Sequence, residues 1–180
     1  MKNDPRELGY LTYDVLRERI KLPSRKRLAK GPVAIIECIE DIPCDPCVEA
    51  CRIGAIRKES LITPPYIDYD KCTGCAVCVD ICPGLAIFVV NMNHSERKAV
   101  VSLPYEMLPV PKVREKVDVL DRSGKKIGVG EIVKVRKGQA ATFVVSISLD
   151  KDLAMEARSI RVSASVYHPD AGRDLRCREE

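Results

Sequence analysis

The chain lacks tryptophan and is poor in side-chain amides, with one glutamine and three asparagines among its 180 residues. Charged residues, by contrast, make up 31% of it. Proteins of thermophiles tend to have many charged residues and few thermolabile amides. The composition therefore favours a thermophilic source.

Long hydrophobic runs are also missing. The longest plainly apolar stretch, LAIFVV at 85–90, is far shorter than the about 20 residues that a membrane-spanning helix needs. The opening stretch MKNDPRELGY is charged and polar and does not resemble a secretory signal. We therefore expect a cytoplasmic protein without a membrane span.

The sequence contains no arrangement typical of a catalytic site. Paired carboxylates in a motif, a nucleophile with its base and a glycine-rich nucleotide fingerprint are all missing. The stretch RSGKKIGVG at 122–130 lacks the spacing and the strand-to-helix context of a phosphate loop, and is predicted to contain a hairpin turn. We expect a chain that makes and breaks no bonds in a substrate.

Cysteine is abundant, with nine residues in the chain. Eight of them form two tight groups within 38–51 and 72–82. In the absence of a secretory signal, clustered cysteines indicate metal ligation rather than a framework of disulfides.

The second group, CTGCAVCVDICP, has the spacing C-x2-C-x2-C-x3-C followed by proline. Three thiolates on one tight loop can hold three corners of a cubane iron–sulfur cluster, and in two-cluster proteins the fourth ligates the other cluster. The small residues Gly74 and Ala76 allow backbone N–H groups to approach the sulfurs. Structural zinc sites usually take cysteines in separated pairs, so the spacing favours iron–sulfur over zinc.

The first group departs from this pattern at its beginning. Overlaying CVEACRIGAI on CVDICPGLAI aligns the last three cysteines of the two groups and places Asp41 opposite Cys72. A spare thiol, Cys38, lies three residues upstream of Asp41. An aspartate ligand and a thiolate on a longer loop both fit this register. We favour Cys38, because iron in such clusters prefers thiolate.

Residues 33–90 resemble the bacterial-type ferredoxin module, which has two [4Fe–4S] clusters. The resemblance implies one cluster on Cys38, Cys44, Cys47 and Cys82, and a second on Cys72, Cys75, Cys78 and Cys51.

A longer pattern, which adds SLPYEMLPVPK and the β-rich tail, resembles something narrower. It is similar to the small iron–sulfur subunits of multisubunit flavin-dependent dehydrogenases that oxidise proline, hydroxyproline, related amines or some polyols. This resemblance implies FAD-containing dehydrogenase subunits as partners, together with further iron–sulfur or flavin subunits.

Hydrophobic patterning and the internal repeat together predict an α+β fold. We expect a ferredoxin-like two-cluster module with a pseudo-twofold repeat, followed by a small β-rich unit of a hairpin, a strand and a short helix. The expected segments are an N-terminal helix and basic arm (1–32), the two-cluster module (33–90), a connector (91–112), the β-rich docking unit (113–165) and a polar tail (166–180).

Net charge bears on whether the protein diffuses freely. The polypeptide carries +4, and two clusters of about −2 each would bring the total near zero. Long-range steering of a diffusing carrier needs a large net charge. The sequence therefore predicts an electron-transfer subunit that relays single electrons between a flavin subunit and an acceptor. A freely diffusing ferredoxin and a zinc or nucleic-acid module are the alternatives.

Other candidate residues lie outside the cysteine groups. The basic run from Arg17 to Lys30 lacks the interleaved aromatics and the motif of a nucleic-acid site, so a solvated face or docking onto a partner subunit explains it better. His94 and His168 lie in polar segments and are expected at the surface. Cys177 is expected to be a spare thiol.

Overall fold

The computed structural model describes residues 4–138 and 141–162. The short helices are α1 (Pro5–Leu8), α2 (Tyr13–Arg19), α3 (Arg25–Leu28), α4 (Pro46–Glu49) and α5 (Val77–Ile81), and the 3₁₀ turn is η1 (Lys151–Leu153). The strands are β1 (Val33–Ile36), β2 (Ile56–Arg57), β3 (Tyr66–Ile67), β4 (Ile87–Asn91), β5 (Lys98–Tyr105), β6 (Lys116–Leu120), β7 (Lys126–Lys137), β8 (Phe143–Asp150) and β9 (Ser159–Arg161). The expected polar tail, with His168 and Cys177, lies outside the described residues.

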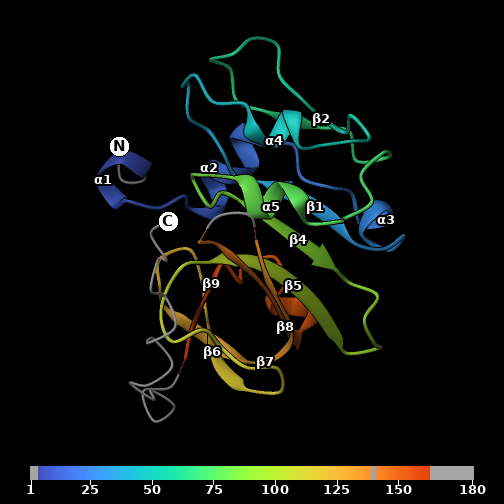
Figure 1. Cartoon of the computed structure of the whole chain (residues 1–180), viewed down its shortest axis with the longest axis vertical. Coiled ribbons are helices and arrows are strands. Elements are labelled where there is room, and N and C mark those ends of the chain that lie inside the picture. Colours follow the sequence, from blue (N-terminus) through green and yellow to red (C-terminus); the bar gives the residue numbers. More distant parts are fainter. Residues whose placement is uncertain (1–3, 139–140, 163–180) are drawn as a thin grey trace, which may run out of the picture.

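One large antiparallel sheet runs through most of the fold. Its seven strands follow the order β1-β4-β5-β8-β7-β6-β9, and β2 and β3 form a separate pair. Figure 1 shows the strands β6, β7 and β9 towards one end of the molecule, helix α4 towards the other, and helix α5 between them. Because β4 pairs with β5, the strands that flank the cysteine segments continue directly into the C-terminal β region, residues 98–161. None of the helices in the described ranges has the length and apolar character that a membrane crossing demands.

Strands β1 and β4 are buried on both faces. Successive side chains of a strand point to opposite faces, so an uninterrupted apolar run serves two cores. Ala34 and Ile36 pack with the cysteine helices, whereas Ile35 and Phe88 pack into the core of the β region. The VAII and IFVV stretches are therefore continuous because each strand separates the cysteine sites from a second core.

The stretch 91–112 differs from the expected connector. It contains β5, which pairs along its whole length with β8 and alternates buried and less buried residues. The sequence had predicted a polar turn, a short strand and a proline-rich stretch here. Strand β4 pairs only with 100–102 of β5, so Pro104 lies where β5 has a neighbour on one side, a position that proline tolerates.

The short helices also differ from the expected ones. Gly9, with a φ of 76°, ends α1, and Thr12 then caps α2 by accepting a hydrogen bond from the N–H of Val15, so the expected single N-terminal helix is two short ones. Near the other end of the described chain, Asp150 precedes a 3₁₀ turn where a short α-helix was expected.

Candidate functional site

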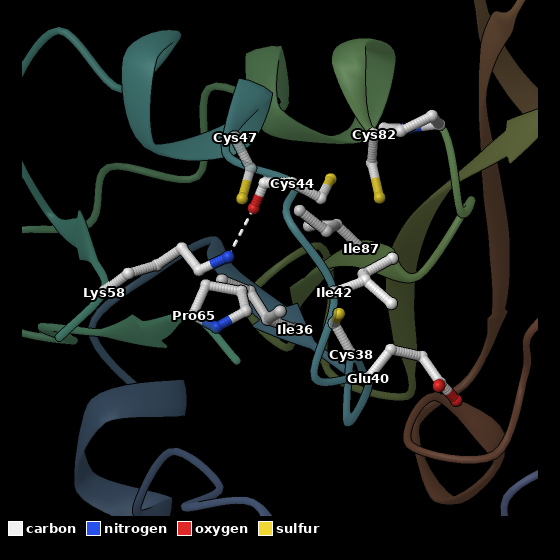
Figure 2. A pocket seen from close by; sticks show the side chains of 11 residues that line it. Ile36, Cys38, Glu40, Ile42, Cys44, Cys47, Lys58, Pro65, Cys82 and Ile87 are labelled. Carbon is white, nitrogen blue, oxygen red and sulfur yellow. Dashed lines mark hydrogen bonds between the residues drawn. The ribbon is translucent and has the colours of Figure 1, made fainter. Parts of the chain in front are cut away.

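Four cysteines, three from the first cysteine group and one from the second, surround one cavity beside β1. Figure 2 shows their side chains gathered around this space, which also has the apolar residues Ile36 and Ile87 in its lining. These four cysteines, called the first set, are Cys38, Cys44, Cys47 and Cys82. The helix α4 supplies one of them and the end of α5 another, so the fold brings both halves of the repeat to one site.

Asp41, the alternative ligand, lies elsewhere. It is exposed and lines a different cavity, together with Arg6 and Arg19. Cys38 is half-buried and faces the other thiols of the first set. The loop that follows β1 therefore brings the thiol, and not the carboxylate, to the cavity.

The other four cysteines line a second cavity, of about 550 Å³. These cysteines, called the second set, are Cys51, Cys72, Cys75 and Cys78. Cys78 is buried in α5, whereas Cys75 is exposed. The two groups of ligands that the sequence resemblance implied are thus brought together separately, with one cysteine of each half of the repeat crossing to the other set.

Backbone N–H groups donate to three of the sulfurs, and at Cys72 Sγ the donor is the N–H of Ala34 at 3.4 Å. The N–H of Ala55 donates to Cys51 Sγ at 3.3 Å, and the N–H of Ala86 donates to Cys82 Sγ at 3.5 Å. In both of these last bonds the donor lies four residues after the last cysteine of its half of the repeat. The two halves therefore share this hydrogen bond to sulfur as well as their sequence pattern. Such bonds stabilise negative charge on ligand sulfur and tune a bound cluster.

Burial shapes the acidity of the innermost thiols. Burial, with a smaller effect of the neighbouring cysteines, raises the pKa of Cys47 to about 11 and that of Cys78 to about 12. Burial also raises the pKa of Cys82, against the lowering effect of the N–H groups of Ala86 and Gly84. The raised pKa values of Cys47 and Cys78 favour the protonated thiols at neutral pH, so a metal that binds these two has to displace protons.

The donor chemistry of both sets fits an iron–sulfur group. Soft thiolates and N–H donors aimed at sulfur are what such a group uses, and the first cavity adds a mainly apolar lining. In the parts of the chain that the structure describes, no three His, Cys, Asp or Glu side chains form a group that could hold one metal ion. Each set of four thiols instead lines a cavity.

Arg27 is a site residue that sequence reasoning missed. Its buried guanidinium donates to four backbone carbonyls, those of Tyr69 at 2.5 Å, Gly31 at 3.2 Å, Pro32 at 3.0 Å and Cys72 at 2.6 Å. This part of the basic run is therefore a clamp on the loop of the second set and not a solvated face. His94 is exposed in the turn between β4 and β5.

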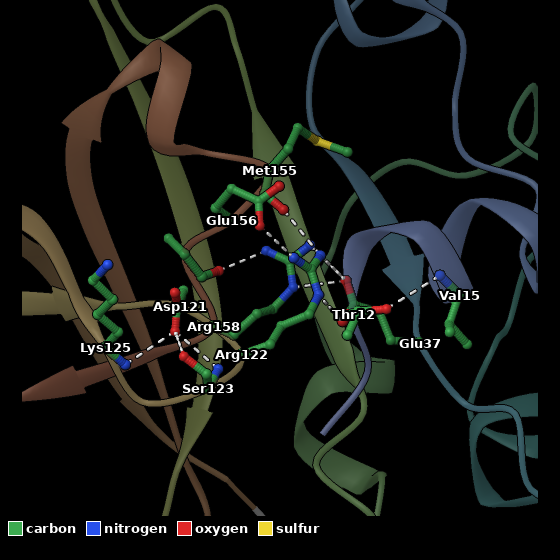
Figure 3. Close-up of polar contacts among 11 residues, drawn as sticks. Thr12, Val15, Glu37, Asp121, Arg122, Ser123, Lys125, Met155, Glu156 and Arg158 are labelled. Atoms are coloured by element: carbon green, nitrogen blue, oxygen red, sulfur yellow. Dashed lines mark hydrogen bonds and ion pairs between the residues drawn. The ribbon is translucent and has the colours of Figure 1, made fainter. Parts of the chain in front are cut away.

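A buried ion cluster links the first set to the C-terminal β region. Glu37, which precedes Cys38, accepts from Arg122 at 2.9 and 2.7 Å and from Arg158 at 2.7 Å (Figure 3). Arg158 also lies 4.7 Å from the centre of the Phe88 ring. Arginines from two places in the β region thus hold the end of β1, where the ligand loop begins.

A third arginine links the second set to the same region. Arg136 of β7 donates to Asp80 Oδ2 at 3.1 Å and to the carbonyl of Ala76 at 3.1 Å. Ala76 lies between two cysteines of the second set and has a φ of 64°. The β region therefore contacts the ligand loops of both sets.

Replacing Gly74 by alanine is expected to destabilise the second set. Gly74 has a φ of +68°, and a Cβ would lie 2.6 Å from Pro32 Cβ and 2.7 Å from its carbonyl carbon. We expect a loss of about 1–3 kcal/mol in the free energy of unfolding, measured by denaturant titration of the metal-loaded protein. Gly54→Ala is the matched control, because Gly54 has a φ of +60° with nothing within 4 Å. An equal loss in both variants would show that backbone strain alone is responsible.

Part of the chain matches the model of a protein family. Residues 65–88, which contain the second cysteine motif, match the 4Fe-4S binding domain. The chain therefore contains a domain that binds a 4Fe–4S cluster. The other cysteine motif lies outside the matched residues, and no solved structure matches the chain significantly.

Three curated proteins share part of the sequence. The chain is 38% identical to a selenate reductase subunit of Mesobacillus selenatarsenatis over 79 residues, which cover 39% of this chain and 26% of that protein. It is 46% identical over 46 residues to pyruvate synthase subunit PorD of Methanothermobacter marburgensis, covering 26% of this chain and 51% of that protein. It has the same identity over the same length to a subunit of the ion-translocating oxidoreductase complex of Methanosarcina acetivorans, covering 17% of that protein. The chain thus spans about half of these relatives or less.

Proposed function

We propose that this protein is an electron-transfer subunit of an oxidoreductase complex, with two [4Fe–4S] clusters. The observation that carries the proposal is the separation of eight cysteines into two sets of four, each around its own cavity. The match of 65–88 to a 4Fe-4S binding domain supports it for the second motif. The names of the three relatives, which are all subunits of oxidoreductases, support the place in a complex.

In this proposal the first set holds one cluster and the second set the other. A cluster bound to four thiolates supplies one-electron redox chemistry. The chain itself positions the sulfurs and donates N–H groups to three of them, and its apolar strands exclude water from one side of the first cavity. Nothing in this arrangement would form or break a bond in an organic substrate.

The partner we propose is an FAD-containing dehydrogenase subunit, which would pass electrons singly to this protein in the cytoplasm. This part depends on the resemblance of the longer sequence pattern to iron–sulfur subunits of flavin-dependent dehydrogenases. Purification from the native host tests it, because a flavoprotein should be recovered with the chain. Recovery of the chain alone, with its full cluster content, would favour the freely diffusing ferredoxin instead.

Metal analysis tests the two-cluster proposal directly. The protein purified without oxygen should contain about eight irons and eight acid-labile sulfides per chain, as two [4Fe–4S] clusters require. The reduced protein should give the electron paramagnetic resonance signal of two interacting clusters. About four irons and four sulfides would leave one cluster, and bound zinc without sulfide would overturn the proposal.

The odd ligand can be identified by substitution. Cys38→Ser should change the spectrum of one cluster only, because serine oxygen is a harder ligand than thiolate. Asp41→Ala should leave both spectra unchanged, since Asp41 is exposed and lines another cavity. The reverse pattern would assign the ligand to Asp41 while leaving the two-cluster proposal intact.

A further inference from the structure

The two cysteine sets differ in their access to solvent. Among the eight cysteines that the structure describes, Cys75 of the second set alone is exposed. Tyr10 and Leu11 of the N-terminal segment line a cavity together with three cysteines of the first set. The second set therefore has the closer approach to the surface.

The surface beside Cys75 is apolar in part. Ile53 is 47% exposed and Val77 is 39% exposed, and both line the second cavity. Large aliphatic side chains exposed next to a functional site are typical of the centre of a contact with another protein.

Basic side chains lie around these apolar residues. Arg52 and Lys137 are exposed and line the same cavity. Asp80 is the acidic residue in the described lining of this cavity, and its side chain is 7% exposed and paired with Arg136. The exposed charge of the lining is therefore positive.

The surroundings of the first set have a different character. Exposed Glu40 and Asp41 line the neighbouring cavity together with Arg6 and Arg19, so both signs of charge are mixed there. The second set thus combines an exposed cysteine, exposed apolar side chains and exposed charges that are all positive.

We propose that this second-site surface, formed by Arg52, Ile53, Cys75, Val77 and Lys137, docks a redox protein whose contact face is apolar at its centre and acidic at its rim. The inference rests on the proposed function and adds the chemistry of the partner and the surface through which the electron enters. Opposite charges at the rim would steer and orient the partner, and the apolar centre would exclude water from the contact. One electron given up by the partner would be taken up at the second set, with no bond formed or broken.

The test uses the cluster-loaded protein and a strongly acidic bacterial ferredoxin as the probe. The dissociation constant is measured by isothermal titration calorimetry at low and at physiological ionic strength. The double variant Arg52→Glu with Lys137→Glu should bind the probe at least about tenfold more weakly at low ionic strength. The difference should shrink as salt shortens the Debye length to about 8 Å.

A matched control separates local from net charge. Lys116→Glu with Lys125→Glu makes the same change in net charge at exposed positions, one at the start of β6 and one in the turn before β7. This control should bind the probe within about twofold of the unchanged protein. Equal weakening in both double variants, or no binding of the probe by the unchanged protein, would overturn the docking inference.

Iron and sulfide are measured on the same samples. Full cluster content with unaltered binding in the Arg52→Glu and Lys137→Glu variant would overturn the docking surface and leave the proposed function standing. Samples without iron would overturn the proposed function, and the docking inference with it.

Discussion

Replacing Glu37 by glutamine is expected to lower the free energy of unfolding by about 3–5 kcal/mol. The Glu37 side chain is 6% exposed, and its two partners, Arg122 and Arg158, are 7% and 4% exposed. An amide keeps the size of the carboxylate but removes its charge, so two buried guanidinium groups would lose the anion that they share. Breaking a buried ion cluster in this way is costly because the remaining charges stay away from water.

Denaturant titration of the cluster-loaded protein, followed by far-ultraviolet circular dichroism without oxygen, measures this loss. Glu156→Gln is the matched control, because Glu156 also pairs with Arg122 but its side chain is 40% exposed. The control should lose about 0–1 kcal/mol, as exposed ion pairs do. Losses of equal size would contradict the central role that we give to Glu37.

The pH dependence of stability, compared between the unchanged protein and Glu37→Gln, gives a second check. Burial raises the pKa of Glu37, but its hydrogen bonds with Arg122 and Arg158 and their charges lower it by more, to below the usual 4.5. A carboxyl group with a lowered pKa contributes stability above its usual pKa and loses that contribution as pH falls through the lowered value. The stability difference between the unchanged protein and Glu37→Gln should therefore be largest above pH 4.5 and shrink below it.

The grouping of the cysteines in the chain was accessible to sequence reasoning because it depends on local spacing, and the internal repeat placed the irregular half in register. The division into two ligand sets came from the resemblance to the two-cluster ferredoxin module and stays a prediction. The structure gathers the eight cysteines in the two groups that the resemblance implied. The position of Cys38 depends on a longer loop, and the spacing alone had left it in competition with Asp41.

The continuous sheet could not be read in the same way. The apolar runs of β1 and β4 predict buried strands, but they do not say which core covers each face. The pairing of β5 with β8 joins residues 98–105 to residues 143–150, which lie far apart in the chain. A sequence pattern reports the period of a strand and not which strands pair with it. From the sequence we therefore expected two units joined by a connector, where the structure has one continuous sheet.

The arginines that support the site show the same limit. Glu37 binds Arg158 across 121 positions of the chain, and Arg27 reaches the carbonyl of Cys72 across 45. A charged residue in a basic run is usually solvated, and nothing in its immediate neighbours marks it as buried. Only the folded chain shows that Arg27 belongs to the loop of the second set.

Replacing Arg27 by methionine is expected to loosen the second set and to lower the free energy of unfolding by about 3 kcal/mol. Methionine keeps an apolar side chain of similar length but donates to none of the four carbonyls that the guanidinium now joins. Carbonyls left without a donor in a partly buried loop would draw in water or shift apart. The loop that carries Cys72 would then open more often.

The rate at which a ferrous chelator removes iron from the reduced protein measures this opening. In Arg27→Met the cluster proposed for the second set should lose iron several times faster. The cluster proposed for the first set should keep its rate, since its cysteines lie around the other cavity. Arg25→Met is the matched control, because Arg25 lies in the same helix α3 and is exposed. Arg27→Lys should fall between the two, as a single ammonium cannot match the fork of a guanidinium. If Arg25→Met released iron as fast as Arg27→Met, the positive charge of α3 and not the clamp would be protecting the second set.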